Sequence, residues 1–260
     1  LSSACHTEPG GGTDLGNLKS TAKRVQGGWR LDGTKVFISH AAHAGLFLVV
    51  ASEDLAKKHR GVSAFLVDPK TEGISIGEFP MRTLKRDNLA EVHFDDVFVP
   101  EDGLLGEAGG GFPVLGSALD MGRYSVAGRC IGQAQRCIDL AVAYATQREA
   151  FGQKIGEFQM NQDMIAQMIV HEEAARLLVY RAACLADQTK PNNLETSIAK
   201  YTAAEAANSA ADAALKILGA YGYSTEFPVE RYYRDAKSYQ IVEGSSNVQK
   251  MIIAQDALGY

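Results

Sequence analysis

Three short stretches of the sequence combine residue types that could hold a cofactor or move a proton. Residues 7–14 form a glycine-rich run with a hydroxyl side chain at each end, and residues 219–223 form a second glycine-rich turn. Residues 243–247 place the carboxylate of Glu243 just before a predicted helix. Glycine lets backbone N–H groups approach an anion closely, and a carboxylate acts as a base where its surroundings raise its pKa.

Each of these patterns also has an ordinary structural explanation. Most glycine-rich runs are turns, and a glutamate before a helix is usually a solvated residue that favours the helix dipole. Neither glycine run follows the strand–loop–helix arrangement of a Rossmann or P-loop site. Spacing alone therefore predicts only a protein of strands and helices whose glycine loops could bind anions.

The first part of the chain, to about residue 106, has the pattern of β structure. Short apolar runs alternate with glycine, proline and Asx turns, which is typical of strands. The strands are predicted at Thr34–Ser39, Leu46–Ala51, Val62–Val67 and Glu91–Val99. Asp32-Gly33 lies between two such flanks and predicts a hairpin turn.

After residues 107–111 the apolar period becomes helical. Helices are predicted at about Phe112–Arg148, Phe158–Asp187, Leu194–Leu218, Pro228–Lys237 and Ser246–Leu258. Ser246 with Gln249 predicts a capping box for the last helix. The sequence thus predicts an α+β protein with an antiparallel β-barrel or sandwich domain at residues 1–110. An up-down, four-helix-bundle-like all-α domain follows at residues 111–260.

Composition excludes several classes of protein. The 260 residues are 46% hydrophobic and 22% charged, with a net charge of −5, so we expect a soluble globular protein that does not bind nucleic acid. We expect no metal site, because no histidine pairs with a cysteine at zinc-like spacing. We also expect no membrane span, because no apolar run is long enough to form one. Cys130 and Cys137 lie about 10.5 Å apart along a helix, too far for a disulfide, and this cysteine usage is typical of a bacterial cytosol or a mitochondrial matrix.

Taken together and in order, five stretches resemble the acyl-CoA dehydrogenase family. They are residues 5–14, 36–39, 147–152, 216–235 and 239–244. Residues 5–14 look like the first signature of the family and residues 216–235 like its second. Residues 239–244 resemble the segment that carries the catalytic base.

The resemblance implies a reaction and a base. The family uses FAD to oxidise acyl-CoA thioesters to 2,3-enoyl-CoA: a base removes the α proton while the β hydrogen leaves as hydride to flavin N5. Glu243 matches the base. Some members carry the base on the first C-terminal helix instead, and the matching position here is Gly122, which has no side chain to act.

The resemblance also implies which residues contact the cofactor. The FAD-binding residues would be Thr7, Phe37, Ser39, Arg148, Phe151, Lys216, Gly219, Ser245 and Asn247. Thr7, Phe37 and Ser39 match contacts to the isoalloxazine ring, and Arg148 and Phe151 match positions that reach the FAD of a neighbouring subunit. The last helix offers its N-terminus to polar cofactor groups.

Substrate contacts are implied for Thr13, Arg123 and Gly244.

Lys216 departs from the family pattern, since it replaces an acidic or amide residue near the FAD pyrophosphate. A cation there would be favourable, so we hypothesise that Lys216 contacts the pyrophosphate.

The implied partners are the acyl-CoA substrate, further copies of the chain in a homotetramer, and an electron-transfer flavoprotein that accepts the electrons. Two alternatives stay open at this point: an acyl-CoA oxidase that passes electrons to O2, and a truncated, non-catalytic oligomeric scaffold. The family has a further N-terminal helical domain that walls the acyl pocket, and we expect such a portion to precede Leu1. Acyl chain length is not encoded in the residues present.

Overall fold

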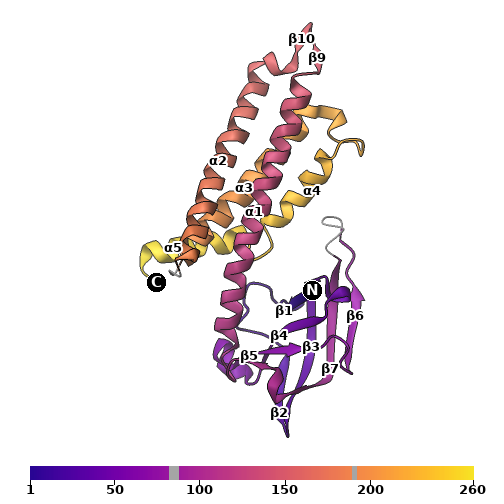
Figure 1. The fold of residues 1–260 in the computed structure, drawn as a ribbon, viewed down its shortest axis with the longest axis vertical. Coiled ribbons are helices and arrows are strands. Elements are labelled where there is room, and N and C mark those ends of the chain that lie inside the picture. Colours follow the sequence, from indigo (N-terminus) through magenta and orange to yellow (C-terminus); the bar gives the residue numbers. More distant parts are fainter. Residues whose placement is uncertain (82–87, 189–191) are drawn as a thin grey trace. The chain divides into compact units, whose positions relative to one another are not determined.

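A computed structural model describes residues 1–81, 88–188 and 192–260. The chain divides into two compact units, Leu1–Ala118 and Leu119–Tyr260 (Figure 1). The first contains a β-sheet and the second contains helices. The fold class expected from the sequence, a β domain followed by a helical domain, is confirmed.

The sheet of the first unit has the strand order β6-β7-β3-β2-β4-β5-β8, with β1 paired to β4 (Figure 1). Its strands are β1 Ser2–Cys5, β2 Thr21–Val25, β3 Gly28–Ser39, β4 Leu46–Ser52, β5 Val62–Val67, β6 Ile74–Glu78, β7 Leu89–Pro100 and β8 Leu104–Leu105. Alternate residues of β3, β4, β5 and β7 meet in one apolar core around Trp29, Phe47, Phe65 and Val92. This core holds the long strand β3 in place.

The sheet is mixed, whereas the sequence predicted antiparallel strands. β1 pairs parallel with β4, from Ser2 opposite Leu46 to Cys5 opposite Val49. The other described long pairings, β2–β3, β3–β7, β4–β5 and β6–β7, are antiparallel. β2 also meets β4 in parallel, at Thr21 opposite Ser52. Alternation within a strand reports which face is buried and not the direction of its neighbour, so the sequence pattern could not show which strands pair in parallel.

The hairpin predicted at Asp32-Gly33 is wrong. Both residues lie inside β3, where the register with β7 shifts between Leu31 and Gly33. Gly33 has φ 146°, and a Cβ atom there would collide with Ser20. The glycine therefore serves a β-bulge with a close backbone approach, and the β2–β3 turn uses Gln26 and Gly27 instead.

The helices lie within three residues of their predicted bounds. They are α1 Gly111–Ala145, α2 Gln159–Asp187, α3 Asn193–Leu218, α4 Val229–Tyr239 and α5 Ser246–Leu258. α1 ends before the predicted Arg148 because the chain turns into a short hairpin, β9 Glu149–Ala150 and β10 Gln153–Lys154, closed by the Ile155 N–H donating to the Arg148 carbonyl. The described residues contain no helix long and apolar enough to cross a membrane.

α3 is the central helix of the second unit, because it packs against α2, α4 and α5. Its buried positions are mostly alanines, which let the neighbouring helices approach closely. Because α3 packs against both α4 and α5, it lies beside the segment that joins them.

The cap of α5 differs from the prediction. Ser245 is the N-cap, and its Oγ accepts a hydrogen bond from the Val248 N–H at 3.4 Å. Ser246 Oγ instead donates to Glu205, and Gln249 donates to the carbonyls of Glu243 and Gly244. The predicted pair thus bonds to the chain before α5 rather than forming a capping box.

Candidate functional site

Glu243 lies in the segment between α4 and α5, at a sharp bend of the backbone. Its φ is 54°, and Gly244 after it has φ 81°. A left-handed conformation is uncommon for a residue with a side chain and costs free energy. Strain of this kind persists where surrounding contacts hold it, and it is concentrated at functional sites.

The carboxylate of Glu243 lies against the backbone of α1 at Gly122. A Cβ atom at Gly122 would be 2.5 Å from Oε2 and 3.1 Å from Oε1 of Glu243. Glycine therefore leaves the space that the carboxylate occupies. The two positions that the family resemblance offered for a base converge on one place in this unit.

Opposing effects act on the pKa of Glu243. Burial raises the pKa, while the cations of Arg129, Arg123 and Lys200 lower it, and the net direction is upward. Among the described residues, no hydrogen bond to its carboxylate oxygens is present. A half-buried carboxylate with free lone pairs and a raised pKa has the properties of a general base.

Arg123, expected on the substrate side, is 8% exposed and lies near the same loop. Its Nη1 donates to Asp120 at 2.9 Å and to Asn193 at 2.8 Å. Its buried Nε has no hydrogen-bond partner among the described residues. An unsatisfied buried donor of this kind is available to a polar ligand group.

Two side chains that the sequence did not single out, Lys200 and Glu205, hold the loop of Glu243. Lys200 Nζ donates to the carbonyls of Tyr239 and Gly244, each at 2.8 Å. Glu205 accepts from Gln240 and Ser246, each at 2.8 Å. A signal for Lys200 was present in the sequence: it is a lysine on the alanine-rich, buried stripe of α3.

In the first unit, the expected flavin-contact residues lie together on and beside β3. The Val36 N–H donates to the Thr7 carbonyl at 2.9 Å, which holds Thr7 next to Phe37. Phe37 has φ 59°, and its ring is 48% exposed with an edge-to-face contact to Phe79 at 4.6 Å. Ser39 is exposed at the end of the strand. An exposed aromatic ring on a strand that also carries a hydroxyl residue fits a flat, polar-edged ring such as that of a flavin.

A buried ion pair anchors the glycine-rich run that carries Thr7 and Thr13. Glu8 accepts from Lys35 Nζ at 2.7 Å and from the N–H groups of Lys19 and Ser20 at 2.6 and 3.1 Å. Burial alone would raise the pKa of Glu8, but these partners together lower it. The carboxylate therefore stays ionised and fixes the start of the run, while Thr13 is exposed.

The remaining expected residues lie in two places in the helical unit. Arg148 lies over the ring of Tyr221, 6.0 Å from its centroid, in the turn that begins at Gly219. Phe151, φ 53°, is 96% exposed on the β9–β10 hairpin. Ser245 and Asn247 stand at the N-terminus of α5, next to Glu243.

Lys216 is exposed near the end of α3, and its ammonium pairs with Asp212 at 2.7 Å. The pair raises the pKa of Lys216 through a side-chain hydrogen bond and the charge of Asp212. The hypothesis that Lys216 contacts a pyrophosphate would require the ammonium to share or exchange this partner.

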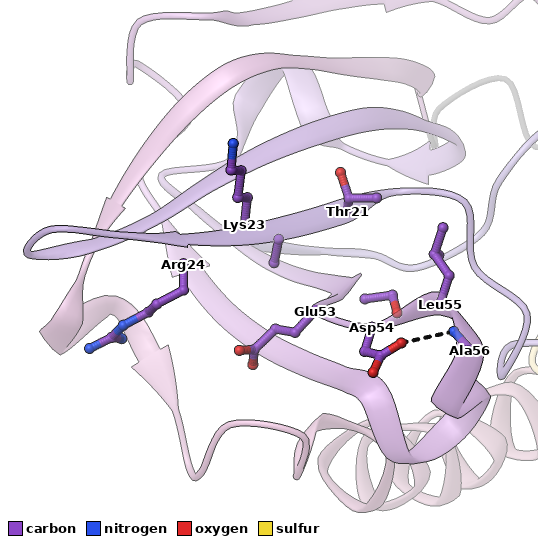
Figure 2. Close-up of a pocket in the computed structure, with 9 residues that line it drawn as sticks. Thr21, Lys23, Arg24, Glu53, Asp54, Leu55 and Ala56 are labelled. Carbon is purple, nitrogen blue, oxygen red and sulfur yellow. Dashed lines mark hydrogen bonds between the residues drawn. The ribbon is translucent and has the colours of Figure 1, made fainter.

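A shallow pocket of 460 Å³ in the β unit contains none of the expected site residues. Its lining includes Lys23, Arg24, Glu53 and Asp54 (Figure 2). Asp54 caps a short 3-10 helix by accepting from the Ala56 N–H, and Glu53 accepts from Trp29 and Ser63. These acidic groups serve local structure, and the described residues contain no cluster that could hold a metal ion.

Comparisons with known proteins give the family. The model of the acyl-CoA dehydrogenase middle domain matches residues 3–97, and that of the C-terminal domain matches residues 109–258. A glutaryl-CoA dehydrogenase of Desulfococcus multivorans is 46% identical over 255 residues, which are 97% of this chain and 66% of the relative. The CarC subunit of a caffeyl-CoA reductase–Etf complex of Acetobacterium woodii is 42% identical over 249 residues, 95% of this chain and 66% of the relative.

A solved structure of a glutaryl-coenzyme A dehydrogenase with glutaryl-CoA superimposes with a TM-score of 0.96 at 45% identity, covering 99% of this chain and 66% of that one. The chain thus spans 66% of the length of both curated relatives. The resemblance drawn from the five stretches is confirmed. The chain belongs to the acyl-CoA dehydrogenase family.

Proposed function

We propose that this chain supplies the catalytic base and flavin contacts of an FAD-dependent acyl-CoA dehydrogenase, which oxidises an acyl-CoA thioester to the 2,3-enoyl-CoA. The observation that carries the proposal is the carboxylate of Glu243. It is partly buried against Gly122, has a raised pKa and has no hydrogen bond to its oxygens among the described residues.

Glu243 would take the α proton of the thioester. This proton is very weakly acidic, so the base must be stronger than a solvated carboxylate and yet ionised at neutral pH. Burial supplies the first property. Arg123, Arg129 and Lys200 supply the second, because their charges favour the ionised form.

FAD, when bound, accepts the β hydrogen as hydride. Within the β unit, Thr7, Phe37 and Ser39 would hold its ring system, and the exposed, left-handed Phe37 supports this assignment. Arg148, Phe151, Lys216, Gly219, Ser245 and Asn247 would contact the cofactor from the helical unit. Thr13, Arg123 and Gly244 would contact the acyl-CoA. The buried Nε of Arg123, which has no partner in the described part of the chain, supports the role of that residue.

We further propose a middle β domain at residues 1–110, a helical domain at residues 111–260 and a homotetramer in which Arg148 and Phe151 reach a neighbour's FAD. The exposure of Phe151 at the tip of a hairpin supports a contact outside its own chain. An electron-transfer flavoprotein is the proposed acceptor, supported by the relative named as part of an Etf complex. A bacterial cytosol or a mitochondrial matrix would suit this chemistry.

The test is the visible spectrum of the purified protein before and after anaerobic addition of glutaryl-CoA, a short straight-chain acyl-CoA or a long one. We expect a flavin band that bleaches with one thioester class. Glu243→Gln should retain the band and abolish the bleaching, while Glu173→Gln, an exposed glutamate on α2, should behave as the wild type.

Two results would contradict the proposal. A colourless, inert protein would favour the scaffold alternative. Bleaching that persists in Glu243→Gln would show that another group is the base. Admitting air to the reduced protein then distinguishes O2 from an electron-transfer flavoprotein as the electron acceptor. Rapid recovery of the flavin band without electron-transfer flavoprotein would favour an oxidase.

A further inference from the structure

A lysine is buried in the centre of the helical unit, where the sequence is otherwise mostly alanine. Lys200 is 0% exposed and lies among Ala199, Ala203 and Ala204 of α3, which are equally buried. Taking an ammonium group out of water costs free energy unless the protein supplies specific partners. An apolar side chain of the same length would fill this space at a lower cost, so the charge calls for an explanation.

The two partners of the ammonium group explain it. Lys200 Nζ donates at 2.8 Å to the carbonyl of Tyr239 and at 2.8 Å to the carbonyl of Gly244. Tyr239 is the last residue of α4, where the helix dipole favours a cation. Gly244 directly follows Glu243. One side chain therefore fixes both ends of the five-residue loop 240–244.

Two further side chains hold the same loop from α3 and α5. Glu205 accepts from Gln240 at the start of the loop and from Ser246 just beyond its end. Gln249, also 0% exposed, donates to the carbonyls of Glu243 at 3.2 Å and Gly244 at 2.9 Å. The left-handed backbone at Glu243 and Gly244 is thus held by contacts at nearly every residue around it.

We propose that Lys200 is a positioning residue, which holds the loop 240–244 in the strained conformation that directs the carboxylate of Glu243 at Gly122, with Glu205 and Gln249 as supporting anchors. This inference rests on the proposed function, because it assigns the loop its purpose from the role of Glu243. Its structural part, the anchoring of the loop, is testable without any turnover.

The first measurement is hydrogen exchange of the loop in the flavin-loaded protein, followed by mass spectrometry. In Lys200→Met, we expect faster exchange in peptides covering residues 238–249 and unchanged exchange in α1 and α2. Lys250→Met is the matched control, since Lys250 is an exposed lysine on α5 that lies over the ring of Tyr201, and it should exchange as the wild type.

The second measurement is the rate of flavin reduction by the thioester identified above. A displacement of a catalytic group by about 1 Å can cost on the order of 100-fold in rate. We therefore expect Lys200→Met to reduce flavin about 10- to 100-fold more slowly with little change in KM. Lys200→Arg, which can still donate to a carbonyl, should recover part of the rate.

The pH profile separates positioning from charge. The charged and titratable groups around Lys200 are Arg123 and Cys130 of α1, Glu205 of α3 and Glu243 itself, and burial lowers the pKa of Lys200 to about 8. Removing its cation in Lys200→Met should move the acid limb of the reduction rate to higher pH. Lys200→Arg keeps the cation, so its limb should stay where it is in the wild type even if its rate falls.

Several outcomes overturn the inference. Wild-type loop exchange with a wild-type rate in Lys200→Met would do so. So would faster exchange across all the helices with a normal rate, because that pattern describes a merely structural lysine. If Lys200→Met does not fold, the deciding variant is Gln249→Met. It removes two hydrogen bonds to the loop and a buried Oε1 that has no partner among the described residues. Unchanged loop exchange in this variant rejects the anchoring.

Failure of the proposed function can be distinguished from failure of the anchoring by Lys200. If Glu243→Gln reduces flavin as the wild type does, Glu243 is not the base. The exchange of the loop in Lys200→Met would still report whether the lysine anchors it.

Discussion

The carboxylate of Glu243 combines two requirements that work against each other. Burial raises its pKa and makes it a stronger base, while Arg129, Arg123 and Lys200 keep it ionised. A solvated glutamate would be too weak a base, and a glutamate buried without cations would stay protonated. The left-handed backbone at residues 243 and 244 brings the carboxylate into this environment.

The pH dependence of flavin reduction follows from this balance. Because the base must be ionised, the rate should rise with pH through an acid limb that lies above 4.5, the ordinary value for a glutamate. Arg129→Gln removes a cation that lowers this pKa, so the limb should move to higher pH. Arg129 is exposed and screened by solvent, so we expect a shift of less than about one pH unit. A stopped-flow pH series measures it, and a shift to lower pH would contradict the assignment.

Gly122 provides a test of where the carboxylate lies. In Gly122→Ala the new Cβ would stand 2.5 Å from Glu243 Oε2, the far end of a flexible side chain, so the carboxylate would rotate away. An alanine inside a helix is favourable by about 0.5–1 kcal/mol relative to glycine. We therefore expect a protein as stable as the wild type, measured by urea unfolding, that reduces flavin at least about 10-fold more slowly.

Gly128→Ala is the control for that experiment. Gly128 lies on the same helix, and a Cβ atom there would meet nothing within 4 Å. It should gain about 0.5–1 kcal/mol of stability from the alanine and keep the wild-type rate. Equal rates in both alanine variants would show that Gly122 does not shape the position of the base.

At the scale of elements, each unit uses a buried charge to hold a loop. In the helical unit α3 anchors the segment between α4 and α5. In the β unit Lys35 of β3 anchors the glycine-rich run through Glu8. The side chains of this ion pair are 0% and 4% exposed, so neither charge has access to water.

Removal of Lys35 should destabilise the β unit strongly. In Lys35→Met the carboxylate of Glu8 would be left buried without its cation, which typically costs about 3–5 kcal/mol. The double variant Lys35→Met with Glu8→Gln removes both charges and should recover part of that loss. Chemical denaturation followed by Trp29 fluorescence measures both, and equal stability of the single variant and the wild type would refute the role of the pair.

The pair should also make stability depend on pH. The pKa of Glu8 is lowered in the folded state. Its contribution is therefore complete above the unfolded value of 4.5 and is lost as pH falls through the lower folded value. The Lys35→Met single variant should lack this part of the acid sensitivity.

At the scale of the whole molecule, the cysteines report on the two cores. Cys5 lies in the core of the β unit, Cys130 and Cys137 lie in the helical unit, and Cys184 is exposed. Burial raises the pKa of the first three thiols to about 12. A thiol-specific reagent at pH 8 should thus label at most one cysteine per native chain, Cys184, and all four after denaturation. Rapid labelling of any remaining cysteine in native Cys184→Ser would contradict the burial of Cys5, Cys130 and Cys137.

The sequence by itself determined the local elements and the family. Helical and strand periods located α1 to α5 and the long strands, because those periods depend on residues a few positions apart. The five ordered stretches identified the family and pointed to Glu243. The wrong hairpin at Asp32-Gly33 shows the limit of local signals, since the same dipeptide also serves a bulge when Ser20, just before β2, approaches it closely.

Only the tertiary structure decided what surrounds the candidate base. Lys200 meets carbonyls 39 and 44 positions away, and Gly122 of α1 meets the carboxylate of a residue near the other end of the helical unit. Periodicity shows that a helix face is buried but not which backbone groups it is buried against. The pKa of Glu243 depends on those distant neighbours, so its suitability as a base is a property of the packed helices and not of the segment that carries it.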